Sequence, residues 1–420
     1  MHNQSQSRSC LYREAMHAVI VGLAIAVLLA LAGPSAQAQT FQVLYTFTGG
    51  MDGASPEGLT MDRDGRLYGS TAGGGHGNCN GGCGTVFRLA QAGSTWQLTT
   101  LYAFAGGGDG PAVGGPVIGL NGSLFLAADG GGGENEGAVI NLTPPATACK
   151  TALCYWTKTE IFQFNIYNGL NPVPGIVVDR AGNLFGTTEL GGAYCYPAGC
   201  GVVYELTPTD GNWADTTLHS FGSGYPYGDG WYPLSGVVLD GNGNAYGTTP
   251  WGGTNDCGIV YSDFGNRIIH EFQCRFGGSG PSGLIIDQEG NLYGTVGTTG
   301  GSAVFEMSPS NGGWTYTIQY VQPGGDGMFG LTMDTAGNLY GVTGFSNLVP
   351  GSIFKLTRSG AGWTYTDIYD FTGGSDGLGP NGLILDANGN LYGTASDGGN
   401  LSDCVRQYFS GCGTLWKITF

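Results

Sequence analysis

Residues 179–188 read Asp-Arg-Ala-Gly-Asn-Leu-Phe-Gly-Thr-Thr and follow the apolar run Ile-Val-Val at 176–178. An Asp in this position accepts hydrogen bonds from backbone N–H groups just ahead of it, so it opens a turn. The Gly three residues later supplies the positive φ that closes a tight antiparallel turn. The stretch therefore predicts a strand, a turn and a second strand. Close copies occur at 62–71, 240–249, 287–295, 334–342 and 386–394, and a degenerate copy at 120–128.

The seven copies are regularly spaced along the chain. Their aromatic residues are separated by 57, 60, 61, 47, 47 and 52 positions, and they are Tyr68, Phe125, Phe185, Tyr246, Tyr293, Tyr340 and Tyr392. After most hairpins come a Gly-rich loop, a third strand such as Gly-Thr-Val-Phe-Arg-Leu at 84–89, and a fourth strand that often opens with Trp. Four antiparallel strands repeated at this period predict an all-β, seven-bladed β-propeller of four-stranded blades.

The two ends of the repeat region complement each other. The sequence ends at Phe420 on a third strand, whereas Val-Leu-Tyr-Thr-Phe at 43–47 matches a fourth strand with none before it. Joined in one sheet, they complete blade seven. We therefore expect the N-terminal strand to close the ring and to remove the exposed edges of an open array.

Residues 1–38 are typical of a secretory signal peptide. Arg8 and Arg13 precede an apolar stretch at 18–32, and Ala-Gln-Ala at 36–38 offers small residues for cleavage. A single membrane anchor is the competing interpretation, but a stretch of about 15 residues is short for a span. We expect residues 39–420 to be one propeller domain without a transmembrane segment, monomeric, and secreted to the extracellular space or the periplasm.

Composition narrows the range of partners. Gly accounts for 82 of 420 residues and charged residues for 11%, while hydrophobic residues reach 41%, enough for a core. Removal of residues 1–38 takes away two Arg and one Glu, leaving 12 basic and 30 acidic residues, a net charge of −18. This sign disfavours nucleic acids and anionic membranes as partners.

Ten cysteines remain after the signal peptide, and they fall into local pairs. An even number of cysteines in an exported chain predicts disulfides that staple loops. A two-residue turn at Gly265-Asn266 would place Cys257 directly opposite Cys274. The predicted pairs are Cys79 with Cys83, Cys149 with Cys154, Cys195 with Cys200, Cys257 with Cys274 and Cys404 with Cys412.

One face of the ring should carry the loops after second strands and the crossovers between blades. Five crossovers contain Asp-Gly, at Asp52, Asp109, Asp229, Asp326 and Asp376. These carboxylates would suit sugar hydroxyls or cations, with calcium as the possible ion and no other cofactor expected. The favoured alternative is that each Asp caps its own turn.

Departures from the repeat are better candidates for binding. Aromatic residues cluster in the crossover into blade four and in nearby loops, at Tyr225, Tyr227, Trp231, Tyr232, Trp251, Tyr194 and Tyr196. Such side chains suit stacking on sugar rings or contact with a protein. The alternative, equally weighted, is that they cover a wide Gly-rich loop.

Catalytic groups are scarce. The inner strands are aliphatic, only three His follow residue 38, and no Ser-His-Asp grouping is indicated. Glu57, Ser235, Ser282 and Asn381 precede inner strands and would form a polar ring at the channel mouth or an ordinary solvated rim.

The repeat as a whole resembles the GloVer tandem repeat of exported bacterial proteins. The resemblance rests on Asp-x-x-Gly-Asn-Leu-Tyr-Gly-Thr-Thr, the Gly-Thr-Val-Phe strand, the Leu-Tyr-x-Phe strand and Gly-Gly-x-Asp-Gly. It implies export and no assigned activity, and this chain lacks the family's C-terminal sorting tail. The hairpin is also similar to NHL-type and lactonase-like propellers, whose metal-binding Glu and Asn have no evident match here.

We therefore expect a secreted module that binds or scaffolds carbohydrate or another exported protein. The alternatives are a lyase or lactonase-like hydrolase that uses rim carboxylates, with or without calcium, and a structural component of the envelope.

Overall fold

The computed structural model describes residues 39–132, 136–146, 155–224, 228–274, 277–324, 327–344, 350–360, 362–404 and 410–420. The predicted signal peptide, 1–38, lies outside the described residues. Phe41–Thr419 form one compact unit, and the fold below is that of this unit. Among the described residues, no helix is long and apolar enough to cross a membrane.

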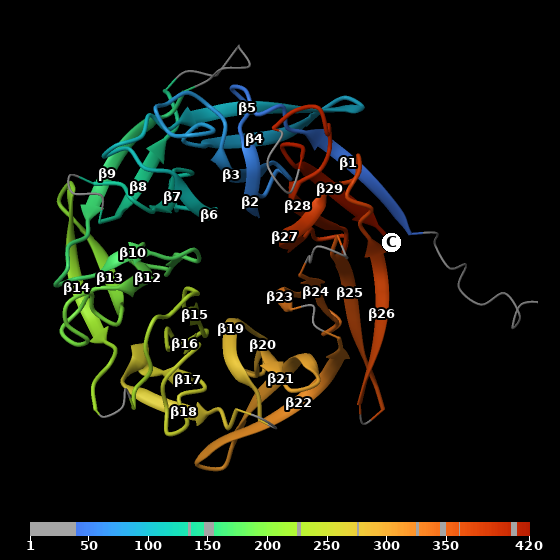
Figure 1. Cartoon of the computed structure of the whole chain (residues 1–420). Helices are drawn as coiled ribbons and strands as arrows, with labels where there is room; N and C mark the ends of the chain where they lie inside the picture. Colours follow the sequence, from blue (N-terminus) through green and yellow to red (C-terminus); the bar gives the residue numbers. More distant parts are fainter. Residues whose placement is uncertain are drawn as a thin grey trace, which may run out of the picture. The chain divides into compact units, whose positions relative to one another are not determined.

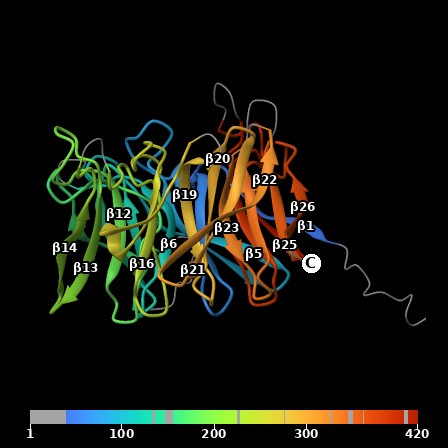
Figure 2. The same ribbon diagram turned by 90° about the horizontal axis from the view of Figure 1, so that it is seen from below.

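Seven antiparallel sheets follow one another around a ring, as predicted (Figure 1). Their strands run between two faces that carry the connecting loops (Figure 2). The strands are β2 Ala54–Met61, β3 Leu67–Gly73, β4 Thr85–Ala92 and β5 Thr95–Ala103 in blade one; β6 Ala112–Ile118, β7 Leu124–Ala128, β8 Ala138–Thr143 and β9 Thr157–Gln163 in blade two; β10 Leu170–Pro172, β11 Val177–Val178, β12 Leu184–Leu190, β13 Val202–Thr209 and β14 Asn212–Ser220 in blade three; β15 Val238–Leu239, β16 Ala245–Thr249, β17 Ile259–Ser262 and β18 Arg267–Glu271 in blade four; β19 Ser279–Ile286, β20 Leu292–Thr298, β21 Gly301–Ser310 and β22 Gly313–Pro323 in blade five; β23 Met328–Met333, β24 Leu339–Thr343, β25 Ser352–Ser359 and β26 Gly362–Asp370 in blade six; β27 Leu378–Leu385, β28 Leu391–Asp397 and β29 Thr414–Thr419 in blade seven.

The predicted ring closure is confirmed. β1 (Thr40–Thr46) joins blade seven in the order β1-β29-β28-β27. Just past this strand, Phe47 N–H donates to Gly413 C=O at 3.0 Å. Phe41 stacks on Tyr369 of blade six with ring centroids 3.8 Å apart. The first and last strands of the unit are therefore held in one sheet, and the neighbouring blade covers that sheet.

The repeated Asp works as predicted. In the 179–188 copy, Asp179 Oδ1 accepts from the N–H groups of Ala181 at 2.8 Å and Asn183 at 2.9 Å. Gly182 N–H donates to Asp179 C=O at 3.2 Å, and Gly182 has a φ of 92°. The turn thus satisfies its own backbone groups and fixes the register of the hairpin.

The Gly two residues after the recurring Leu makes room for an aromatic ring on the neighbouring strand, which the repeat pattern alone does not show. Gly69 of β3 lies opposite Phe87 of β4, and a Cβ on Gly69 would be 2.4 Å from Cζ of Phe87. Blades one and three to seven each place this Gly under an aromatic ring, with Gly393 under Trp416 in blade seven. Blade two has Leu126 opposite Ile140 instead. The absence of a side chain on one strand therefore makes room for the large ring on the next strand.

The core lies between blades. One cluster joins Leu44 and Phe47 of blade seven to Leu67 and Phe87 of blade one, and each of these side chains is at most 9% exposed. A single four-stranded sheet cannot cover both of its apolar faces, so each blade depends on its two neighbours.

Four of the five predicted disulfides are confirmed. They are Cys79–Cys83, Cys195–Cys200, Cys257–Cys274 and Cys404–Cys412, with Cα–Cα distances of 5.1, 5.5, 5.3 and 5.2 Å.

The fifth predicted disulfide, between Cys149 and Cys154, is not confirmed. Cys149 lies outside the described residues, and Cys154 also lies outside them. Both cysteines belong to the segment between β8 and β9 that the structure does not describe. The bond between Cys149 and Cys154 therefore stays a prediction from the sequence.

The register predicted for the third and fourth strands of blade four is wrong. The turn is the 3₁₀ segment η1 (Asp263–Gly265), and a bulge between Val260 and Tyr261 shifts the pairing to Val260 opposite His270. Cys257 and Cys274 therefore lie beyond the ends of β17 and β18 and not in a cross-strand pair. The error arose because Asp263 and Phe264 adopt φ values of 54° and 55°, which their residue types do not favour.

Candidate functional site

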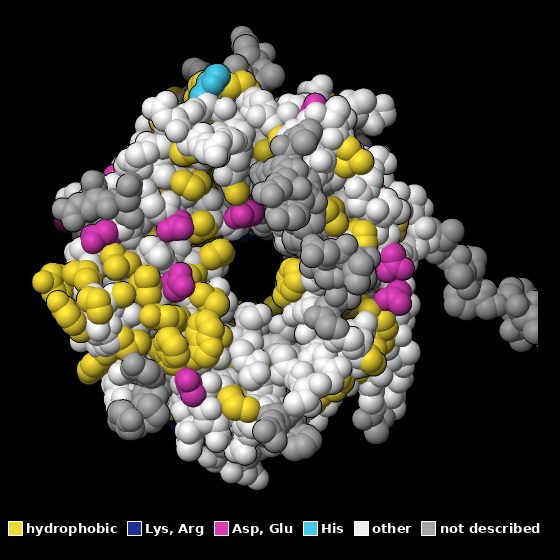
Figure 3. Space-filling view, viewed as in Figure 1, with side chains coloured by type: hydrophobic (Ala, Val, Ile, Leu, Met, Phe, Trp, Pro, Cys, Tyr) yellow, Lys and Arg dark blue, Asp and Glu magenta, His cyan; other side chains and the backbone are white. Residues whose placement is uncertain are grey.

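A hydrophobic surface covers the sector of blades three and four on one face of the ring (Figure 3). Five of the large hydrophobic side chains in this sector are exposed: Tyr167 84%, Tyr194 45%, Tyr196 96%, Leu234 48% and Trp251 38%. Trp231 and Tyr232 lie half-buried beside them. We call these seven residues the aromatic platform. Such a concentration on one sector marks an interaction surface more than scattered exposed side chains would.

Trp231, Tyr232 and Trp251 form the centre of the platform. The centroid of the Trp231 ring lies 5.2 Å from that of Trp251 and 4.6 Å from that of Tyr232. Trp231 Nε1 donates to Asp256 Oδ1 at 2.9 Å, and the same oxygen accepts Gly252 N–H at 2.9 Å. The loop that follows β16 thus fixes both indoles, because it carries Trp251 and its Asp256 binds the indole N–H of Trp231. Part of Trp251 stays open to solvent.

Backbone hydrogen bonds tie the loops of the platform to one another. Tyr232 N–H donates to Cys200 C=O at 2.8 Å, and Trp231 N–H donates to Trp251 C=O at 3.3 Å. Gly192 N–H donates to Ile166 C=O at 2.9 Å, next to Tyr167. The Cys195–Cys200 disulfide encloses Tyr196. Four separate segments therefore build one surface.

Most of the predicted aromatic sector is brought together here. Tyr194, Tyr196, Trp231, Tyr232 and Trp251 all belong to the platform, whereas Tyr225 and Tyr227 lie outside the described residues. Tyr167 and Leu234 also belong to the platform but were not predicted from the sequence. Tyr167 lies in one of the two crossovers without Asp-Gly, and that departure from the repeat could have indicated it.

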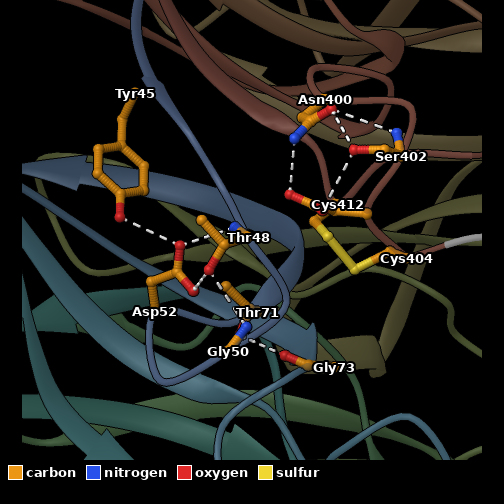
Figure 4. Close-up of a disulfide and its surroundings, with 11 residues drawn as sticks. Tyr45, Thr48, Gly50, Asp52, Thr71, Gly73, Asn400, Ser402, Cys404 and Cys412 are labelled. Atoms are coloured by element: carbon orange, nitrogen blue, oxygen red, sulfur yellow. Dashed lines mark hydrogen bonds between the residues drawn. A yellow bond between two sulfur atoms is a disulfide. The ribbon is translucent and has the colours of Figure 1, made fainter.

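The Asp residues of the crossovers are engaged within their own loops. Asp52 accepts Tyr45 Oη–H at 3.1 Å, Thr48 N–H at 2.8 Å and Thr48 Oγ1–H at 2.6 Å (Figure 4). Asp376 makes the equivalent contacts with Tyr369 and Thr372, and both carboxylates are buried. These contacts explain the repeated Asp without a ligand.

Two further crossover carboxylates follow the same plan with different partners. Asp109 accepts Tyr102 Oη–H at 3.0 Å and Ala105 N–H at 2.8 Å, and also pairs with Lys158. Asp229 contacts His219 Nε2 at 3.1 Å and accepts from Gly222 N–H and Ser223 Oγ–H. Asp326 lies outside the described residues.

These contacts reveal that a fourth-strand residue and the Asp of the next crossover recur as a pair, which was not predicted from the sequence. The residue two positions before the Phe that ends the fourth-strand motif holds the Asp of the following crossover, as Tyr45 holds Asp52. Where the crossover lacks Asp, that position holds Phe162 or His270. Comparison of the two positions across blades could have predicted this.

Asp229 remains ionised at neutral pH. Burial raises its pKa, but hydrogen bonds from His219, Ser223 and the Gly222 N–H outweigh burial and lower the pKa overall.

The predicted polar ring at the channel mouth is only partly assembled. Glu57 Oε2 accepts Gly114 N–H at 3.2 Å, and Asn381 Nδ2 donates to Pro56 C=O at 3.3 Å, so these two residues lie close together. Ser235 and Ser282 contact hydroxyls of their own blades, those of Thr248 at 3.3 Å and Thr295 at 3.2 Å. Burial raises the pKa of Glu57, and the Gly114 N–H offsets part of this rise.

The described residues offer no group of three His, Cys, Asp or Glu side chains that would hold a metal ion. A cavity of about 660 Å³ lies on the face of the hairpin turns, between blades five and six. Its Asp287 and Asp334 carboxylates hold their own turns, and its Arg358 contacts Tyr293 and Glu306. The aromatic platform therefore remains the main candidate site.

Comparison with solved structures shows the propeller fold alone. A polysaccharide lyase of family PL25, an ulvan lyase bound to a glucuronate–sulfated rhamnose ligand, is 11% identical with a TM-score of 0.54; the match covers 89% of this chain and 95% of that one. YCF48 from Cyanidioschyzon merolae is 12% identical with a TM-score of 0.50, over 90% and 98% of the two chains. A gluconolactonase from Xanthomonas campestris is 13% identical with a TM-score of 0.43, over 91% and 90%.

No curated protein matches the sequence. The repeat itself is matched three times, over residues 34–196, 152–348 and 197–406, by the Gloeobacter/Verrucomicrobia repeat. These matches span most of the chain, and the chain belongs to the Gloeobacter/Verrucomicrobia repeat family.

Proposed function

We propose that this protein is an exported carbohydrate-binding module whose aromatic platform stacks on sugar rings. The observation that carries the proposal is the gathering of exposed aromatic side chains from four segments onto one sector of one face. The apolar C–H faces of sugars pack on flat aromatic rings, and Tyr and Trp add a polar edge for hydroxyl groups.

The platform has features of a preformed site. Trp231 is fixed through its indole N–H by Asp256, and the Cys195–Cys200 disulfide closes the loop that carries Tyr196. Fixing these side chains before binding lowers the entropy lost when a ligand orders them. Four disulfides also suit an oxidising compartment and therefore support export.

A contact with another exported protein is the second candidate, because an exposed apolar patch of this kind also suits a protein interface. The flat rings of the exposed Tyr and Trp side chains place the sugar first, because the C–H faces of sugars stack on such rings.

The test is a glycan array followed by calorimetry on the exported protein, its Trp251→Ala variant and a Tyr155→Ala control. Tyr155 is 50% exposed but lies outside the platform. We expect Trp251→Ala to weaken glycan binding about five- to thirtyfold, since stacking on one aromatic ring contributes roughly 1–2 kcal/mol, and Tyr155→Ala to leave it unchanged. Glycan binding that survives Trp251→Ala would contradict the proposal. Failure to bind any glycan, together with a protein partner lost in Trp251→Ala, would favour the protein interface.

A further inference from the structure

The two faces of the ring differ in charge. The described crossovers and the described loops after second strands contain no Lys or Arg. They contain eight carboxylates: Asp52, Asp109, Asp129, Glu136, Asp229, Asp256, Asp376 and Asp403. Figure 3 shows carboxylates and hydrophobic side chains distributed over this face. Among the described residues, the negative charge of these loops has no basic counterpart within the same loops.

Among the described residues, the basic side chains belong to the strands and to the turns of the other face, whereas Arg275 and Arg406 lie outside the described residues. Arg63, Arg66 and Arg180 lie in hairpin turns, where Arg66 pairs with Asp62 and Asp64 at 3.3 and 2.8 Å. Lys355 and Lys417 lie over the rings of Tyr340 and Tyr392, 5.2 Å from each centroid. The described part of the hairpin face is therefore mixed in sign, whereas the described loops of the platform face carry only acidic charges.

Three carboxylates lie in or beside the loops that carry the centre of the platform. Asp256 accepts a hydrogen bond from the indole N–H of Trp231. Asp229 lies two residues before Trp231, in the crossover into blade four. Glu271 accepts the backbone N–H of Thr254 at 2.7 Å and the hydroxyl of the same residue. Hydrogen bonds from Thr254 lower the pKa of Glu271, so this group also stays ionised at neutral pH.

We propose, on the basis of the function above, that the platform selects polysaccharides by charge: it binds uncharged or amine-bearing chains and rejects chains that carry uronate or sulfate. An anionic sugar stacked on Trp251 would enter the field of several carboxylates with no cation in the described loops to receive it. Like charges brought together without a counterion oppose binding, and salt screens this repulsion. A neutral chain meets the same aromatic surface without that cost.

The experiment uses matched chains that differ only in charge: a glucan and its carboxymethyl derivative, and an N-acetylglucosamine oligomer and its deacetylated form. Dissociation constants are measured at about 20 and about 300 mM NaCl, which span weak and strong screening. At low salt we expect the carboxymethyl chain to bind at least about tenfold more weakly than its parent and to recover most of this difference at high salt. The deacetylated oligomer should bind more tightly than its parent at low salt.

Two variants locate the effect. Glu271→Gln removes a charge next to the platform and should reduce the discrimination against the carboxymethyl chain about two- to threefold. Asp64→Asn removes an exposed charge from the hairpin face and should change nothing. Asp64 is the matched control because its only described ion pair is with Arg66 on that face.

The outcomes separate this inference from the proposed function. Tighter binding of a carboxymethyl or sulfated chain than of its uncharged parent, lost in Trp251→Ala, would overturn charge selection and leave the platform as a glycan site. Binding of no polysaccharide of any charge would overturn both.

Discussion

The crossover into blade one (residues 47–53) and the crossover into blade four (221–237) are built around the same carboxylate contact but serve different ends. Asp52 and Asp229 each accept hydrogen bonds from a backbone N–H and a hydroxyl of their own loop and from a side chain of the preceding fourth strand. The first crossover leads directly into the eight-residue strand β2. The second contributes Trp231, Tyr232 and Leu234 to the platform and leads to β15, which has two residues.

The comparison of the two crossovers separates features that stabilise the scaffold from features that are available for the proposed ligand binding. The Asp contact recurs in four described crossovers whose surfaces differ, so it belongs to the scaffold, although the blades that follow Phe162 and His270 are built without it. The inner strand of blade four, β15, has only two residues, and the crossover before it is long and rich in aromatic residues. We infer that variation is tolerated where the neighbouring blades already fix the sheet.

The largest effect is expected from loss of the shared carboxylate. Asp52→Ala and Asp229→Ala should each lower the free energy of unfolding by about 3 kcal/mol, because hydrogen bonds to a charged group are lost and buried donors are left without partners. Urea denaturation measures the change. A loss at Asp52 but none at Asp229 would break the comparison.

The next effect concerns two glycines that each meet a proline of the following blade or of the crossover into it. Gly413 and Gly201 have φ values of 93° and 94°, and an added Cβ would lie 2.5 Å from Cδ of Pro56 and 2.7 Å from Cδ of Pro233. The same Cβ atoms would lie 2.5 Å from Ala395 C=O and 2.4 Å from Thr188 C=O within their own blades. Gly413→Ala and Gly201→Ala should each cost about 2–3 kcal/mol, from backbone strain together with steric overlap.

Gly65→Ala is the control for these variants, because Gly65 has a φ of 77° but nothing within 4 Å of an added Cβ. We expect it to cost only about 1 kcal/mol, the strain alone. Equal losses at all three sites, measured in one urea series, would show that steric overlap at Gly413 and Gly201 adds nothing to the backbone strain.

A smaller effect is expected at His270, which precedes the crossover into blade five, a crossover that lacks the Asp. His270 occupies the position of Tyr45 and His219, but its ring stacks on that of Tyr316 with centroids 4.1 Å apart, and its buried Nε2 has no hydrogen-bond partner among the described residues. Burial lowers the pKa of His270 although Glu271 opposes this. The unfolded state then binds the proton more readily, so the stability from the neutral imidazole is present above about pH 6.5 and is lost as the pH falls through the folded pKa.

His270→Phe should remove this part of the pH dependence, since Phe162 holds the same position in blade two. Thermal melts at several pH values between about 5 and 8, the range in which imidazole titrates, measure it. An unchanged slope in the variant would assign the dependence to other groups.

The smallest expected effect is a gain. Tyr204 and Tyr261, in the blades of the platform, are fully buried and their hydroxyls have no hydrogen-bond partner among the described residues, whereas Phe87 holds the position in blade one. Tyr204→Phe and Tyr261→Phe should each raise the free energy of unfolding by about 0.5–1 kcal/mol, because an unsatisfied hydroxyl is no longer buried. A loss of stability in either variant would show that the hydroxyl has a partner such as a bound water.

Much of the scaffold was predictable because its causes are local. Asp179 and Gly182 form their turn with atoms a few residues away, and that pattern is repeated in the sequence. Gly69 and Phe87 each occupy a position that recurs in most copies of the repeat. The sequence did not show that the two residues pack against each other across strands. The turn of blade four was predicted wrongly because Asp263 and Phe264 adopt a left-handed backbone that no local pattern favours.

The sequence by itself determined the number of blades and the closure of the ring, because each copy encodes its own turns and has two apolar faces that only neighbouring copies can cover. Only the tertiary structure decided that Tyr167 and Leu234 share one surface with Tyr196 and Trp251, which the sequence had already grouped. Their loops are far apart along the chain, and their proximity is set by the packing of blades three and four and by backbone hydrogen bonds between their loops, which no repeat pattern records.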